Sequence, residues 1–144
     1  MTESERELGT CWFEQVWNQG RREAIAEMMA HDAIVHDGES TTVGRDAFYS
    51  LFDRMTATFS ETHISVEDTI AEGDKICVRW RCACRHTGGG LGITPTGETV
   101  HFTGISIMRI ADSVFVEAWQ NWDMLGVIEQ IKGVGISGTY ISAA

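Results

Sequence analysis

The chain has 144 residues, of which 11 are basic and 21 acidic, so its formal net charge is -10 at pH 7. Its length predicts one domain over residues 1–144, and a hydrophobic content of 43% is typical of a globular protein rather than a disordered one. The negative charge disfavours nucleic acid and membrane surfaces as the main partner, because phosphate backbones and anionic lipids repel it.

No segment predicts export or membrane insertion. The first twelve residues alternate in charge, whereas a signal peptide has a basic start followed by an apolar stretch. No apolar run approaches the ~18 residues that are needed to cross a bilayer. We therefore expect a cytoplasmic protein whose four cysteines lack C-x-x-C spacing and remain free thiols, namely Cys11, Cys77, Cys82 and Cys84.

Apolar residues at helical spacing predict three helices in the N-terminal part of the chain. The first helix ends at residues 18–20, the second covers residues 22–30, and the third covers residues 45–59. A short extended piece at residues 33–36 and a polar turn at residues 37–40 separate the second helix from the third.

Beyond the third helix, the apolar pattern changes to a period of two, which is typical of strands with one buried face. A glycine-rich loop is predicted at residues 87–98, a last helix begins after Asp123, and the tail from Gly133 is either an added edge strand or loose. This order predicts an α+β fold, in which three N-terminal helices wrap a curved antiparallel β-sheet into a cone with an internal pocket, and a short C-terminal helix follows. The predicted strands cover residues 63–71, 76–86, 99–110 and 114–122.

Strand alternation predicts which side chains face the core. In residues 76–86 the even positions are apolar and end at His86, whereas the odd positions carry arginines that mark a solvent or subunit face. His101 has the parity of a face that points outward unless a bulge intervenes. In the last strand the odd face holds the acids, and if it points inward, two carboxylates and an amide project into an apolar cavity; this face comprises Phe115, Glu117, Trp119, Asn121 and Asp123.

Several short motifs together carry a family resemblance. They are Gly73-Asp74, Arg79-Trp80, His86-Thr87-Gly88, the segment 92–97, Gly104, Arg109, and Glu117-Ala118-Trp119 followed by Asp123. With the helix–helix–turn–helix–meander order, the chain resembles SnoaL-like polyketide cyclases of the nuclear-transport-factor-2-like superfamily, from about Trp17 to Ile131. The resemblance implies intramolecular aldol ring closure without a cofactor or metal, carried out by a carboxylate and a histidine inside the cone.

The resemblance implies Asp123 as the acid/base residue and His86 or His101 as the histidine beside it. A carboxyl group in an apolar pocket is desolvated, which raises its pKa and suits it to remove a proton next to a carbonyl. Gln120 stands where many relatives carry an acid, and a neutral amide cannot accept that proton. The further candidates for substrate contact are His36, Trp80, Glu117, Trp119 and Asn121.

Three functions stay open at this point. The first is acid/base chemistry on a small apolar carbonyl compound; the second is a non-catalytic ligand-binding or dimerisation module, in which Asp123 only caps a helix. The third is epoxide opening by activated water, which in this superfamily uses an Asp-Arg-Asp set. No metal is expected, because the neighbouring His31, His36 and Asp37 match no ligand spacing. We expect a homodimer, whose arginine-rich sheet face pairs with acidic residues across a two-fold axis.

Overall fold

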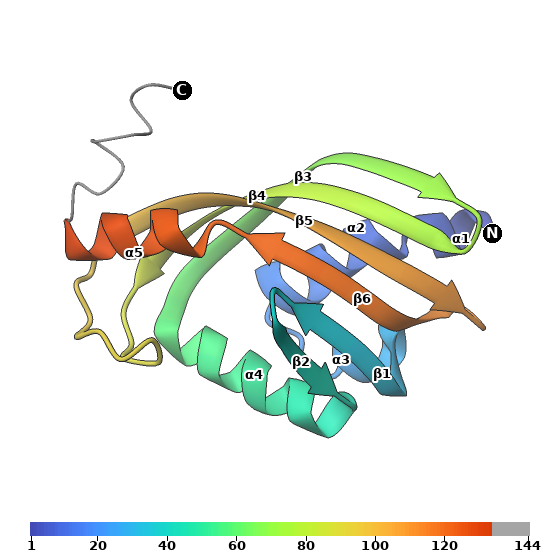
Figure 1. Ribbon diagram of the computed structural model, residues 1–144, viewed down its shortest axis with the longest axis horizontal. Coiled ribbons are helices and arrows are strands. Elements are labelled where there is room, and N and C mark those ends of the chain that lie inside the picture. The colour runs from blue at the N-terminus through green and yellow to red at the C-terminus, as the bar shows by residue number, and fades with distance from the viewer. Residues whose placement is uncertain (134–144) are drawn as a thin grey trace.

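The computed structural model describes residues 1–133, so the predicted tail over residues 134–144 lies outside the described part (Figure 1). The N-terminal region holds short helices rather than one long first helix. A capping box at Thr2 begins the first of them, because the Thr2 hydroxyl accepts from the Glu5 amide at 3.1 Å. These helices are α1 (Glu3–Arg6), α2 (Leu8–Trp12), the π-helical segment η1 (Phe13–Asn18) and α3 (Ala24–Met28).

A six-stranded sheet forms the other layer, in the order β2-β1-β6-β5-β4-β3. All neighbouring strands are antiparallel except β1 and β6, which are parallel, so the sheet is mixed rather than purely antiparallel. The α+β class and the helix-covered sheet agree with the sequence prediction. The strands are β1 (Met29–Asp37), β2 (Ser40–Val43), β3 (Phe59–Glu72), β4 (Lys75–His86), β5 (Thr99–Ala111) and β6 (Val114–Trp122).

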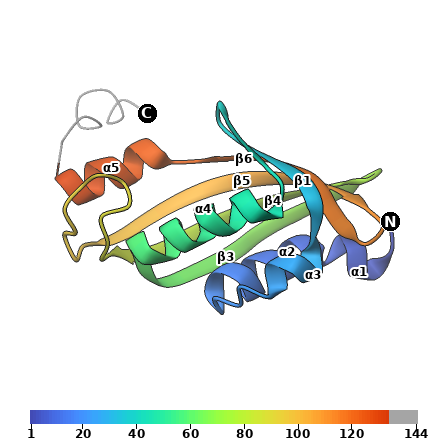
Figure 2. The same ribbon diagram turned by 90° about the horizontal axis from the view of Figure 1, so that it is seen from below.

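Helices cover the inner face of the curved sheet (Figures 1 and 2). The helix α4 (Arg45–Thr58) runs beneath the sheet, beside the N-terminal helices. The helix α5 (Met124–Lys132) follows the edge of β5 beyond the end of β6, where Gln130 exchanges two hydrogen bonds of 2.8 Å with the backbone of His101. Within residues 1–133, no helix combines the length and the apolar composition needed to span a bilayer.

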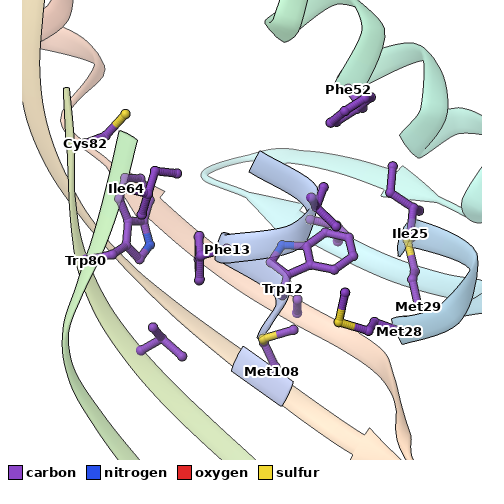
Figure 3. Packing of buried hydrophobic residues seen from close by; sticks show 14 of the residues in the cluster. Trp12, Phe13, Ile25, Met28, Met29, Phe52, Ile64, Trp80, Cys82 and Met108 are labelled. Carbon is purple, nitrogen blue, oxygen red and sulfur yellow. The ribbon is translucent and has the colours of Figure 1, made fainter. Parts of the chain in front are cut away.

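The core lies between the sheet and these helices (Figure 3). Trp12 packs against Phe115 from β6, with ring centroids 4.9 Å apart, and Phe13 packs against Trp80 from β4 at 5.5 Å. Close approach requires glycine at one point of this core, because a Cβ atom on Gly104 would overlap the Trp80 ring. The indole of Trp80 therefore lies directly across β5.

The predicted inner face is confirmed for β4 but not for β6. The even positions of β4 are buried, from Ile76 to His86, and its arginines are exposed, as the alternation predicts. In β6 the odd face does not point inward: Gln120 lies opposite the buried Ser106, so the acidic face points outward. The cause is a register shift in the pairing of β5 with β6, where Arg109 lies opposite Glu117 but Ile110 lies opposite Phe115. Phe115 therefore faces the core, and the residues after it alternate in the opposite sense.

Candidate functional site

A cavity of about 640 Å³ lies between the inner face of the sheet and the helices. Its walls are mainly apolar and aromatic, and they include Trp12, Phe48, Phe102 and Phe115. Among the lining residues in the described part of the chain, two are charged, Asp37 and Arg54. A concave apolar site with a few polar groups is the usual form of a small-molecule site.

Asp37 supplies the carboxylate of this cavity, at the end of β1 where the chain turns into β2. Its Oδ2 atom accepts hydrogen bonds from Gln120 Nε2 at 3.3 Å and from Trp122 Nε1 at 3.4 Å. The parallel pairing of β1 with β6 brings these groups together, since Asp37 lies opposite Gln120 in the sheet. Both donors therefore bind the same carboxylate oxygen, Oδ2, while Oδ1 has no hydrogen-bond donor among the described residues.

A chain of hydrogen bonds leads to Asp37 from the centre of the sheet. Trp80 Nε1 donates to Ser106 Oγ at 3.1 Å, and Ser106 Oγ donates to Gln120 Oε1 at 3.4 Å. The direction is fixed at both ends, because the Trp80 indole only donates and the ionised carboxylate of Asp37 only accepts. The amide oxygen of Gln120 consequently faces Ser106, and its NH₂ group faces Asp37.

Asp123 does not project into the cavity. It is exposed, and its side chain accepts a hydrogen bond from the Gly126 amide at 2.9 Å as the N-cap of α5. The chain leaves the sheet at Trp122 and turns directly into the helix, which directs Asp123 to the surface. The expectation of a desolvated carboxylate at position 123 is therefore wrong.

His86 is fully buried at the end of β4 but does not line the cavity. Its Nδ1 atom accepts a hydrogen bond from the Thr96 amide at 3.3 Å, which fastens the loop of residues 87–98 to the sheet. Its Nε2 atom is buried and has no hydrogen-bond partner among the described residues. The location of His86 suits positioning of the loop, whose Gly90 and Leu91 line the cavity.

Most other predicted site residues lie on the outer face of the sheet. His36 Nε2 is 2.8 Å from Glu117 Oε2, Arg109 donates to Glu117 Oε1 at 3.2 Å, and the His36 ring stacks on Trp119 at 5.5 Å. The hydrogen bond from His36, together with Arg109, holds the pKa of Glu117 below its ordinary value. This cluster is separated from the cavity by the sheet, because inward and outward positions alternate.

The remaining candidates divide between the two faces. His101 is exposed on the outer face of β5. Asn121 is exposed at the end of β6, where it borders both the cavity and an outer groove. Trp80 alone among them is buried and lines the cavity with its hydrogen-bonded indole.

Two thiols also line the cavity, at the even positions Cys82 and Cys84 of β4. Hydrogen bonding between them, together with burial, raises the pKa of Cys82, and the same hydrogen bond lowers the pKa of Cys84. Within residues 1–133, no group of three or more His, Cys, Asp or Glu side chains is arranged to hold a metal ion.

Sequence reasoning did not place five polar residues at the cavity, namely Asp37, Arg54, Ser106, Gln120 and Trp122. A signal was present at Asp37, since a carboxylate directly follows the short extended piece that ends at His36. The rest of the site depends on the pairing of β1 with β6, which brings together residues more than eighty positions apart in the sequence.

The model of the SnoaL-like polyketide cyclase family matches residues 10–131, which is most of the chain. The chain belongs to this family. The family has the nuclear-transport-factor-2-like fold seen here, and the resemblance in the sequence is confirmed. No curated protein is a significant match to this SnoaL-like chain.

Solved structures share the fold of this SnoaL-like protein at low sequence identity. A proposed SnoaL-like polyketide cyclase from Jannaschia sp. CCS1 has a TM-score of 0.84 at 22% identity, covering 91% of this chain and 93% of its own. AclR, a proposed hydroxylase from Streptomyces galilaeus, has a TM-score of 0.80 at 20% identity, with coverage of 92% and 99%. IdmH, a proposed polyketide cyclase from Streptomyces antibioticus, has a TM-score of 0.75 at 22% identity, with coverage of 92% and 100%. These likenesses support the fold, and one fold serves several activities.

Proposed function

We propose that this SnoaL-like protein is a cofactor-independent enzyme that moves a proton next to the carbonyl group of a small apolar compound, in an aldol cyclisation or an isomerisation. Asp37 is the proton acceptor. The proposal rests on two observations: among residues 1–133, Asp37 is the only carboxylate that lines the cavity, and two neutral donors hold its Oδ2 atom.

The hydrogen bonds assign different tasks to the two oxygens of Asp37. Gln120 and Trp122 fix Oδ2 and thereby the plane of the carboxylate, so that Oδ1 is available to a C–H group of the substrate. Ser106 and Trp80 are positioning residues, because they fix the orientation of the Gln120 amide. A carboxylate held in this way can act as a general base, with a typical contribution of about 10²- to 10⁴-fold in rate.

The proton balance of the reaction closes without another reactant. Asp37 removes a proton from the carbon next to a carbonyl, and the resulting enolate carbon attacks a second carbonyl of the same molecule. The new alkoxide then takes the proton back from Asp37, so ring closure consumes neither acid nor base. In an isomerisation, Asp37 returns the proton to another carbon instead.

Asp37→Asn tests this proposal, since the amide has nearly the same shape but cannot accept the proton. We expect the wild-type protein to speed the exchange of the α-protons of 1-tetralone in D₂O, and the variant to lose about 100-fold or more of that rate. Proton NMR measures the exchange, and the rise in melting temperature on adding the ketone measures its binding. A wild-type protein that binds apolar ketones without exchanging their protons would favour the non-catalytic binding module.

The epoxide-opening alternative has less support. It needs an arginine between two aspartates inside the cavity, and among the lining residues only Asp37 is acidic. Arg79, Arg81 and Arg85 are exposed on the outer face of β4, and Arg109 pairs with Glu117 on the same side of the sheet.

A further inference from the structure

We infer that Arg54 forms a binding site for an organic anion at the edge of the cavity, so that the ligand has an apolar body and a carboxylate or sulfonate at one end. The inference rests on the proposed function, because it names the class of compound that enters the same cavity. Arg54 lies on α4 between the lining residues Leu51 and Met55, and it is exposed although it lines the cavity.

Arg54 is the only cation that lines the cavity among residues 1–133. A neutral apolar ligand would leave its guanidinium to water, whereas an anionic group could form a charge-assisted, two-pronged hydrogen bond with it. Asp37, the other charged lining residue, repels an anion. The two charges together therefore orient an asymmetric ligand, with its anionic end at Arg54 and its carbonyl region toward Asp37.

In the described part of the chain, the guanidinium of Arg54 forms no ion pair. Its neighbour Asp53 is engaged by Arg22, at 3.0 and 3.1 Å, and Glu61 is engaged by Arg85 at 3.5 Å. Within residues 1–133, no carboxylate lies within 4.0 Å of Arg54.

The rest of the Arg54 residue is held in place. A Cβ atom added to Gly90 would lie 3.2 Å from Arg54 Cγ and 3.3 Å from the Arg54 carbonyl oxygen, so the loop packs directly against this arginine. The same carbonyl accepts a hydrogen bond from the fully buried Thr58 hydroxyl at 2.7 Å. The start of the side chain is thus held between α4 and the loop, while the residue as a whole is exposed.

Two dyes with the same aromatic body distinguish the contribution of an anionic group to binding from that of the apolar rings. Anilinonaphthalene-1-sulfonate carries a sulfonate, whereas N-phenyl-1-naphthylamine is its neutral counterpart, and both fluoresce when they enter an apolar site. Competition between the dyes shows whether they occupy the same cavity. The titrations use wild-type protein, Arg54→Gln, Arg54→Lys, and Arg6→Gln as a control, because Arg6 is an exposed arginine on α1 that lines neither the cavity nor the outer groove.

We expect Arg54→Gln to weaken binding of the sulfonate dye by about three- to tenfold and binding of the neutral dye by less than twofold, as for a partly exposed charge pair. Arg54→Lys should retain part of the affinity, and Arg6→Gln all of it. Equal effects of Arg54→Gln on both dyes, or no effect on the sulfonate dye, would overturn the inference. The titrations require no turnover, so their outcome is independent of whether Asp37 catalyses proton exchange.

Discussion

Two carboxylates near the junction of β1 and β6 show how the faces of a sheet separate chemical roles. Asp37 points toward the cavity and meets only neutral donors, the amide of Gln120 and the indole of Trp122. Glu117 points outward and meets His36 and the cation of Arg109. A carboxylate between neutral donors keeps an oxygen for a substrate, whereas one held by a histidine and an arginine is committed to stabilising the fold.

The lowered pKa of Glu117 makes a prediction about stability and pH. A depressed pKa in the folded state contributes stability above the unfolded value of about 4.5, and this contribution is lost as the pH falls through the folded value. Glu117→Gln should therefore lower the free energy of unfolding at pH 7, and the difference from wild type should shrink below pH 4.5. Urea unfolding at pH 7 and pH 3 measures both values. A difference that does not change with pH would mean that Glu117 acts through packing alone.

At the scale of elements, the transition from β6 to α5 decides which acid reaches the cavity. The register shift near Phe115 turns Gln120 inward, and the strand ends two residues later at Trp122. Asp123 is then the first residue beyond the sheet and caps α5 by accepting from the Gly126 amide. The side chain of Asp123 is thus used to begin a helix rather than to face the ligand.

Capping predicts the effect of changing Asp123. Asp123→Ala should lower the free energy of unfolding by about 1 kcal/mol, because it leaves an amide of the first helical turn without its acceptor. Asp123→Asn should restore most of this stability, since asparagine is an equally good N-cap. Chemical denaturation followed by circular dichroism measures both. An alanine variant as stable as the wild type would contradict the capping role.

Local patterns predicted the elements well where one face is buried and the partner is near in sequence. The helix predicted over residues 45–59 ends only one residue earlier, and the alternation of β4 holds to His86. By contrast, β2 was not predicted, because its residues are mainly polar and exposed and show no buried face. The parallel pairing of β1 with β6 was not predicted either, because nothing in either strand identifies a partner more than eighty residues away. The site depends on that pairing, so Asp37 was assigned to a turn while Asp123 was assigned to the site.

At the scale of the whole molecule, the outer face of the sheet is an apolar strip bordered by charges. Ile105 is 49% exposed and Ile107 36%, and both line a groove with Trp119 and the arginines of β4. Glu67, which pairs with Arg81 at 3.1 Å, borders the same groove. We propose that two copies associate through this face, because a two-fold axis would bring the arginines of one copy to the acids of the other.

A charge introduced on this face should prevent association. Ile107→Lys places a cation among arginines in an apolar interface and should give a monomer, whereas the wild type should elute as a dimer. Val43→Lys is a matched control, because Val43 is a 64% exposed apolar residue on β2, at the far edge of the sheet. Size-exclusion chromatography with light scattering gives the masses. A wild-type protein of monomer mass would contradict the dimer.

The most direct test of the account compares Asp37→Asn with Asp123→Asn in one exchange experiment. Both variants replace a carboxylate by an amide, but only Asp37 lines the cavity. The account predicts that Asp37→Asn lowers the rate of α-proton exchange of 1-tetralone by about 100-fold or more, while Asp123→Asn stays within about twofold of the wild type. The reverse result, in which exchange depends on Asp123 and not on Asp37, would contradict it.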